Sequence, residues 1–137
     1  MPRRPFLIPA AAAAGLLVLG GCASVTERES AASRAVQRFE AALQAGQAER
    51  ACAVLAPGTV AELEDSAKTA CPAALSDAGV PAGGAVERVD VYGRQALVVL
   101  RHDTLFLSVF PDGWRITAAG CEPRTGGLPY SCEVKGE

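Results

Sequence analysis

The stretch Thr104-Leu-Phe-Leu-Ser-Val-Phe-Pro-Asp-Gly-Trp-Arg-Ile-Thr-Ala118 contains two strand-like arms joined by a turn. Branched and aromatic residues dominate both arms, and such residues favour extended backbone. Between the arms, Pro111 presets one turn angle and Gly113 accepts a positive φ, so this segment predicts a tight turn. From Trp114 to Ala118 apolar and polar side chains alternate, which predicts one buried and one solvated face. The stretch therefore predicts an antiparallel hairpin.

Two further strand-like segments precede this hairpin. Gly93-Arg94 separates them, and His102-Asp103 separates the second of them from the hairpin. Runs of branched residues joined by such short turns are typical of an antiparallel meander. The sequence therefore predicts four strands, at Val86–Tyr92, Gln95–Arg101, Thr104–Phe110 and Trp114–Cys121.

The residues before the meander have helical periodicity. Apolar side chains recur at helical spacing at Ala32, Ala35, Val36, Phe39, Ala42 and Leu43. The opposite face is assigned to Arg34, Arg38, Glu40 and Gln44. This amphipathic helix is expected to begin at a capping box, Thr26 to Glu29, or at Ser30, and to end at Gly46.

Shorter helices are expected after Gly46, at 47–55, 59–68 and 71–75, followed by a loop over 76–84 that is rich in Gly and Pro. Pro57 is expected to end the first of these, and a capping box at Thr59 to open the next. Helices first and strands afterwards predict the α+β class.

The first residues have the pattern of an export signal. Arg3 and Arg4 precede an uncharged apolar run from Phe6 to Leu19. Leu19-Gly20-Gly21-Cys22 then resembles the lipobox of bacterial lipoprotein precursors, in which the cysteine thiol receives the lipid. The expected organisation is a signal peptide over 1–21, a lipidated tether over 22–29 and one domain over 30–137, held at the extracytoplasmic face of the cell membrane.

Two alternatives to this interpretation of the leader stay open. The apolar residues from Pro5 to Ala23 approach the length of about 20 residues that a membrane-spanning helix needs, although Pro9 argues against such a helix. Arg3-Arg4-Pro5-Phe6-Leu7 also resembles part of the twin-arginine export signal. General secretion is favoured over the twin-arginine pathway, because the polar residue that usually precedes the arginines is missing.

Composition excludes nucleic acid as a partner. The chain has 13 basic and 15 acidic side chains, and two of the basic ones, Arg3 and Arg4, lie in the leader. The part that follows it therefore carries a net charge of −4. Phosphate backbones are bound by clustered Lys and Arg, whereas here the arginines are dispersed among acids.

Cysteine usage predicts two disulfides. Without Cys22, four cysteines are left for an oxidising compartment: Cys52, Cys71, Cys121 and Cys132. We favour the pairing local in sequence, Cys52–Cys71 and Cys121–Cys132, although spacing alone leaves all three pairings open. No Cys-x-x-Cys occurs and His102 is the single histidine, so we expect no metal site.

The order of elements, with Asp112-Gly113-Trp114-Arg115-Ile116 in the last hairpin, resembles the nuclear-transport-factor-like, or cystatin-like, superfamily. The resemblance covers most of residues 30–121. It implies a curved sheet of the cone type with an internal cavity. That cavity serves enzymes such as ketosteroid isomerase and scytalone dehydratase as well as non-catalytic binders and dimerisation modules, so the fold alone decides no function.

No catalytic constellation is found in the sequence, and we expect no cofactor. Asp90 and Tyr92 share a strand face, but Asp90 beside Arg88 is more simply a surface ion pair. His102 abuts a turn and lacks a Gly-x-Ser-x-Gly elbow. The alternative to a non-enzymatic protein is a small isomerase- or hydrolase-like enzyme that uses Asp90, His102 or Tyr130.

The third expected strand is apolar on both faces, because Phe106 and Phe110 lie opposite Leu105, Leu107 and Val109. We therefore expect Phe106 and Phe110 to contact an apolar small molecule, a lipid or an envelope protein. Two alternatives stay open: that these rings fill the core beneath the helices, and that an open sheet face closes a homodimer.

Overall fold

A computed structural model describes residues 1–2 and 23–136 and places four helices before a five-stranded sheet. Residues 3–22, which comprise most of the leader and Cys22 at the end of its lipobox, lie outside the described residues. None of the described helices is long and apolar enough to cross a membrane. The helices are α1 (Val25–Gln44), α2 (Ala48–Cys52), α3 (Pro57–Ala67) and α4 (Cys71–Ala78). The strands are β1 (Val86–Tyr92), β2 (Gln95–Leu100), β3 (Thr104–Phe110), β4 (Gly113–Glu122) and β5 (Ser131–Lys135).

Helix α1 begins earlier than the sequence predicted. Ser24 is its N-cap and forms a capping box with Glu27, in which each side chain accepts from the other residue's backbone N–H. The predicted starts of this helix, a capping box at Thr26 to Glu29 or Ser30, are therefore wrong. Residues 25–29, assigned to the tether, are helical instead.

The three short helices occur close to where they were expected, but their starts differ. Pro57 is the first residue of α3 rather than the end of α2, since a missing N–H costs nothing in the first helical turn. Thr59 does not cap a helix, because its hydroxyl donates to the Thr117 carbonyl of β4 at 3.0 Å. The Cys52–Cys71 disulfide then joins the end of α2 to the start of α4.

The sheet is an antiparallel meander in the order β1-β2-β3-β4-β5. The four predicted strands are present, and the count of four is wrong because β5 adds a fifth. Its pairing with β4 runs from Ala118↔Lys135 to Glu122↔Ser131. The predicted Cys121–Cys132 disulfide lies inside this pairing and links the two strands directly.

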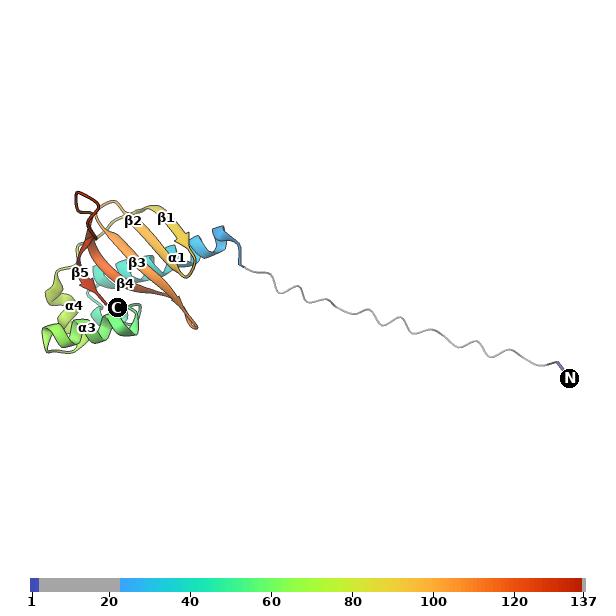
Figure 1. Cartoon of the computed structure of the whole chain (residues 1–137). Coiled ribbons are helices and arrows are strands. Elements are labelled where there is room, and N and C mark those ends of the chain that lie inside the picture. The colour runs from blue at the N-terminus through green and yellow to red at the C-terminus, as the bar shows by residue number, and fades with distance from the viewer. Residues whose placement is uncertain (3–22, 137) are drawn as a thin grey trace.

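Helix α1 packs across one face of the sheet, and α3 and α4 lie at the β5 end (Figure 1). Phe39 and Val36 of α1 are fully buried in one core with Leu105 and Leu107 of β3 and Ile116 of β4. Large apolar side chains buried in this way are the main source of folding free energy. The opposite face of the sheet carries no helix (Figure 1), and we call it the outer face.

Candidate functional site

A groove of about 680 Å³ opens between the second half of α1, α2 and the β3–β4 hairpin. Its volume lies within the range of small-molecule sites, roughly 300–1,000 Å³. It is on the helix side of the sheet. Its lining residues are Arg38, Ala41, Ala42, Ala45, Gln47, Arg50, Ala53, Val54, Asp112, Trp114 and Arg115.

Small side chains leave the space open on the α1 wall. Ala41, Ala42 and Ala45 fall within little more than one helical turn and line the groove together. A larger residue at any of the three would project into the groove. The amphipathic face of α1 thus ends in an alanine surface that does not fill the gap to the hairpin.

Trp114 supplies the aromatic surface of the groove. Its residue is only 7% exposed, and the guanidinium of Arg28 lies 5.8 Å from the centre of its ring. A cation over an indole face at this distance is attracted by the ring's quadrupole. Trp114 is therefore held between α1 and the sheet, with part of its surface turned to the groove.

Arg115 fixes the hairpin to the segment after α2. It pairs with the Asp112 carboxylate, and its Nη1 donates to the Ala53 carbonyl at 2.7 Å and the Leu55 carbonyl at 3.4 Å. The hydrogen bond from Arg115 lowers the pKa of Asp112, and the same bond raises the pKa of Arg115. The charges of these two residues therefore satisfy each other.

Two other arginines at the groove are available to a ligand. Arg38 on α1 and Arg50 on α2 are both exposed, and in the described part of the chain neither pairs with a carboxylate. With Asp112 and Arg115 paired, the rim carries a net positive charge. The arrangement combines an apolar floor with a cationic edge and suits an anionic amphiphile.

The groove does not include the two rings that the sequence singled out. Phe106 and Phe110 lie on the outer face of β3 and are partly buried. The ring of Tyr130 stands edge-on to that of Phe106 with 5.1 Å between their centres. One alternative was that these rings fill the core beneath the helices. Their place on the outer face, which carries no helix, disagrees with it.

The residues that the alternative enzyme hypothesis would use lie on separate elements. Asp90 on β1 pairs with Arg88 at 2.8 Å, His102 is exposed in the β2–β3 turn, and Tyr130 lies just before β5. No hydrogen bond joins any two of these three side chains within the described residues. Nor does that part of the chain hold a group of three side chains suited to a metal ion.

Sequence reasoning missed two buried carboxylates. Glu40, assigned to the polar face of α1, is 5% exposed, and its Oε2 accepts from the Gly83 N–H at 2.9 Å. Asp103 is 7% exposed and accepts three backbone N–H groups, from Thr104, Gly120 and Cys121. Glu40 follows Val36 by one turn, and that spacing was the available indication that it faces the core.

Burial raises the pKa of both carboxyl groups. For Glu40 the hydrogen bond from Gly83 opposes the increase, and the charge of Asp103 adds to it. For Asp103 the three backbone hydrogen bonds oppose it. Oε1 of Glu40 is buried without a partner in the described residues, so no hydrogen bond to that oxygen offsets the cost of burying the charged form.

Neither a protein-family model, nor a curated protein, nor a solved structure matches this chain.

Proposed function

We propose that this protein is a lipid-anchored, extracytoplasmic binding module whose groove holds a small amphiphile with an apolar body and an anionic group. The observation that carries the proposal is that the buried indole of Trp114 lines one opening together with the guanidinium groups of Arg38 and Arg50, which have no carboxylate partner among the described residues. Apolar sites with a few placed polar groups are typical of binding pockets.

The leader sequence supports the proposed location at the membrane. Leu19-Gly20-Gly21-Cys22 supports lipid attachment at Cys22. Because α1 begins at Val25 after its Ser24 cap, only Ala23 would separate the lipidated cysteine from that cap. The domain would sit against the membrane at the beginning of α1, without a long linker.

The same proposal includes the cone-type fold of the nuclear-transport-factor-like superfamily. Register shifts interrupt the β1–β2 ladder near Val86 and the β3–β4 ladder near Phe106, and such bulges bend a sheet. A sheet that bends around α1 supports a cone, with the groove at its mouth.

The proposed ligand class follows from the charges of the groove. An aliphatic or aromatic body would replace water over the alanines and Trp114, and this gains roughly 25 cal/mol per Å² of apolar area buried. A carboxylate, sulfonate or phosphate on that body would reach Arg38 or Arg50, and charge-assisted hydrogen bonds of this kind are the stronger ones.

The test uses Trp114 as its reporter, because it is the sole tryptophan of the chain. The full chain, reconstituted in phosphatidylcholine vesicles, is titrated with octanoate and, in parallel, with octanol of the same chain length. We expect a saturable change in Trp114 emission, with octanoate binding at least tenfold more tightly than octanol, a ratio equal to about 1.4 kcal/mol.

Two variants separate the groove from the rest of the surface. Arg38→Gln with Arg50→Gln should remove the preference for octanoate while leaving octanol binding unchanged. Phe106→Ala, on the other face of the sheet, is the matched control and should bind as the wild type does. A Trp114 signal that never saturates, or a preference that survives in the double variant, would contradict the proposal.

A further inference from the structure

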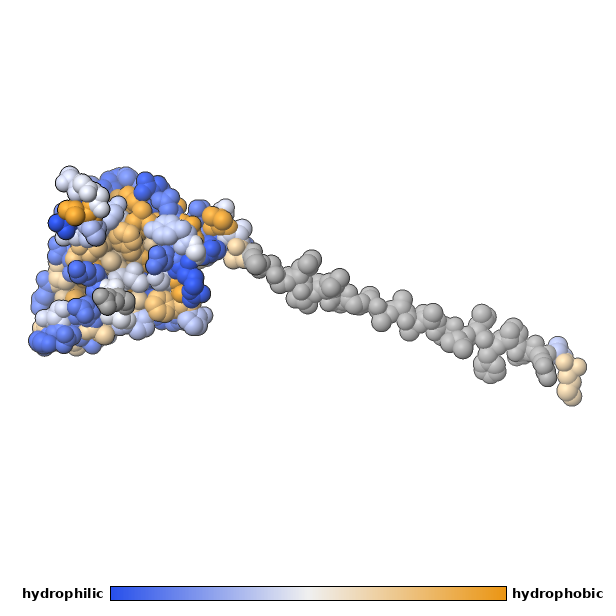
Figure 2. Space-filling view, viewed as in Figure 1, coloured by the Kyte–Doolittle hydropathy of each residue, from blue (hydrophilic) through white to orange (hydrophobic). Residues whose placement is uncertain are grey.

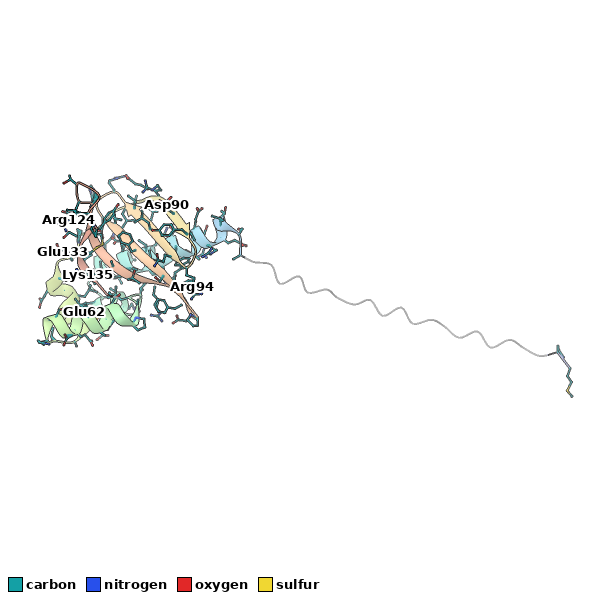
Figure 3. The ribbon with its side chains drawn as sticks, in the orientation of Figure 1. Glu62, Asp90, Arg94, Arg124, Glu133 and Lys135 are labelled. Carbon is teal, nitrogen blue, oxygen red and sulfur yellow. A yellow bond between two sulfur atoms is a disulfide. The ribbon has the colours of Figure 1, made fainter. Side chains whose placement is uncertain are left out.

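The outer face of the sheet has an apolar centre between charged edges. Leu97, Val99, Phe106 and Phe110 are partly exposed there, and Tyr130 beside Phe106 is 37% exposed. Figure 2 shows apolar surface over the middle strands and hydrophilic surface at both sides. Asp90 lies at one edge of the sheet, and Glu133 and Lys135 at the other (Figure 3).

The strand registers place opposite charges at the two ends of the same row. Asp90 pairs with Leu97, Leu97 with Phe106, Phe106 with Ala118, and Ala118 with Lys135. One row of neighbours therefore crosses all five strands, with an aspartate on β1, an apolar centre and a lysine on β5.

A second row, two residues along the strands, repeats the arrangement with the signs exchanged. Arg88 on β1 pairs with Val99, and Val99 with Thr104 on β3. At the other edge Glu133 stands beside Gly120, where a Cβ added to the glycine would lie 2.9 Å from that of Glu133. Arg88 and Glu133 thus end a row as Asp90 and Lys135 do.

This pattern is complementary to itself under a two-fold rotation. A half-turn about an axis along β3 lays β1 of one copy over β5 of the other without shifting residues along the strands. Asp90 then faces Lys135 of the second copy, Arg88 faces Glu133, and Phe106 faces Phe106. We propose that two copies of this chain associate face to face through the outer faces of their sheets.

The charges at the β5 edge of the free protomer also favour a second copy as the partner of the outer face. Glu133 and Lys135 are exposed, and in the described part of the chain neither has a partner of opposite charge. In the dimer Glu133 pairs with Arg88 and Lys135 with Asp90 of the other copy. Each pair occurs twice, because a two-fold interface repeats every contact. Such edge pairs set the orientation of the two copies, while the apolar centre supplies most of the affinity.

The geometry also suits the groove and the proposed anchor. The groove opens on the helix side, so the dimer leaves it free. An axis along the strands keeps the beginning of α1 at the same end in both copies, which allows two lipids on Cys22 to enter one membrane. Sheets packed in this way lie about 10 Å apart with their strands roughly aligned.

The test is a charge exchange between the two edges. Within one protomer Asp90 and Lys135 are four strand spacings apart, roughly 19 Å, which exceeds the Debye length of about 8 Å at physiological salt. If a change at Asp90 restores the association that a change at Lys135 has weakened, the two side chains must therefore meet between two copies. Association of the full chain in non-ionic detergent is measured by sedimentation velocity up to about 100 µM, where weak dimers form.

We expect the wild type to dimerise and Lys135→Glu, which would face Asp90 of the other copy, to raise the dissociation constant at least tenfold. Adding Asp90→Lys to Lys135→Glu should restore it to within about threefold of the wild type. Glu62→Lys, exposed on α3 and away from the face (Figure 3), is the control and should leave the dimer unchanged.

Phe106→Asp should make the protein monomeric, with an unaltered circular dichroism spectrum showing that it folds. A monomeric wild type, a Lys135→Glu defect that Asp90→Lys fails to rescue, or a dimer insensitive to Phe106→Asp would each overturn the proposal. So would a monomer whose Phe106→Asp variant loses affinity for phosphatidylcholine vesicles, because the face would then contact lipid.

Discussion

The carboxylate of Glu40 accepts a hydrogen bond from the backbone N–H of Gly83 at 2.9 Å, and this contact ties α1 to the loop before β1. The Gly83 carbonyl accepts from the His102 N–H at 2.9 Å. A Cβ added to Gly83 would lie 2.2 Å from Cδ1 of Leu100 and 3.2 Å from Cβ of Asp103. The loop therefore passes between helix and sheet at a point where a Cβ would collide with the buried side chain of Leu100.

Gly83→Ala should destabilise the domain by about 1–3 kcal/mol, because Leu100 must leave its packed position to admit the methyl group. Urea unfolding at neutral pH measures the change. Ala82→Ser, at the exposed neighbouring position, should stay within about 0.5 kcal/mol of the wild type. Equal stability of Gly83→Ala and wild type would show that the loop moves aside freely.

Glu40→Gln should stabilise the domain at pH 7 by about 1 kcal/mol. Glutamine keeps an oxygen for Gly83, and it removes both the buried charge and its repulsion with Asp103. Glu40→Ala is the contrasting variant. It leaves the buried N–H of Gly83 without an acceptor and should destabilise by about 1–3 kcal/mol.

The raised pKa of the Glu40 carboxyl predicts how the stability of the domain depends on pH. The folded pKa of Glu40 lies above its ordinary value of 4.5, so between these two values the folded chain holds a proton that the unfolded chain has lost. Stability contributed by this group is complete below pH 4.5 and is lost as the pH rises through the folded pKa. Asp103 acts in the same direction.

Urea unfolding at several pH values between 4.5 and 8 should therefore show a smaller decline for Glu40→Gln than for the wild type. The Asp103 contribution should persist in the variant. An identical decline in both proteins would mean that Glu40 titrates normally.

The parts of the fold that depend on local chemistry could be predicted from the sequence. Pro111 and Gly113 fix the β3–β4 turn, and the period-two pattern after them fixes the faces of β4. Glu40 could not be assigned by residue type, since a carboxylate on a helix is usually solvated. Its burial depends on Gly83, which is 43 residues away.

Strand β5 and the groove were missed for a similar reason. Only Val134 of β5 is buried, and a short polar strand after a loop rich in Gly and Pro has a weak pattern. The groove forms where α1, α2 and the hairpin meet, and in the sequence Arg38 and Arg50 are ordinary polar positions of two helices. Neither feature exists before the chain is folded.

Removing the β4–β5 disulfide should free the last strand. In Cys121→Ser with Cys132→Ser, we expect a loss of about 3 kcal/mol, the entropic contribution of a short closed loop. Hydrogen exchange should rise most in β5, since Val134 alone holds it in the core. The matched control, Cys52→Ser with Cys71→Ser, should increase exchange in α2 and α4 instead. Exchange that rises equally throughout both variants would show that neither bridge acts locally.

The proposed anchor depends on the thiol of Cys22, the one cysteine outside the two disulfides. Cells fed a labelled fatty acid should transfer label to the wild type and none to Cys22→Ala, because alanine has no nucleophilic sulfur to take the diacylglycerol. Cleavage of the leader should fail in the same variant and leave a longer chain on a gel. Gly21→Leu should give a similar defect with the thiol intact, since a large residue does not suit the extended backbone that the peptidase admits.

A Cys22→Ala chain that is cut at the normal position and released as a soluble protein would show instead that the leader is an ordinary secretory signal. The groove and the sheet face would then act free of the membrane.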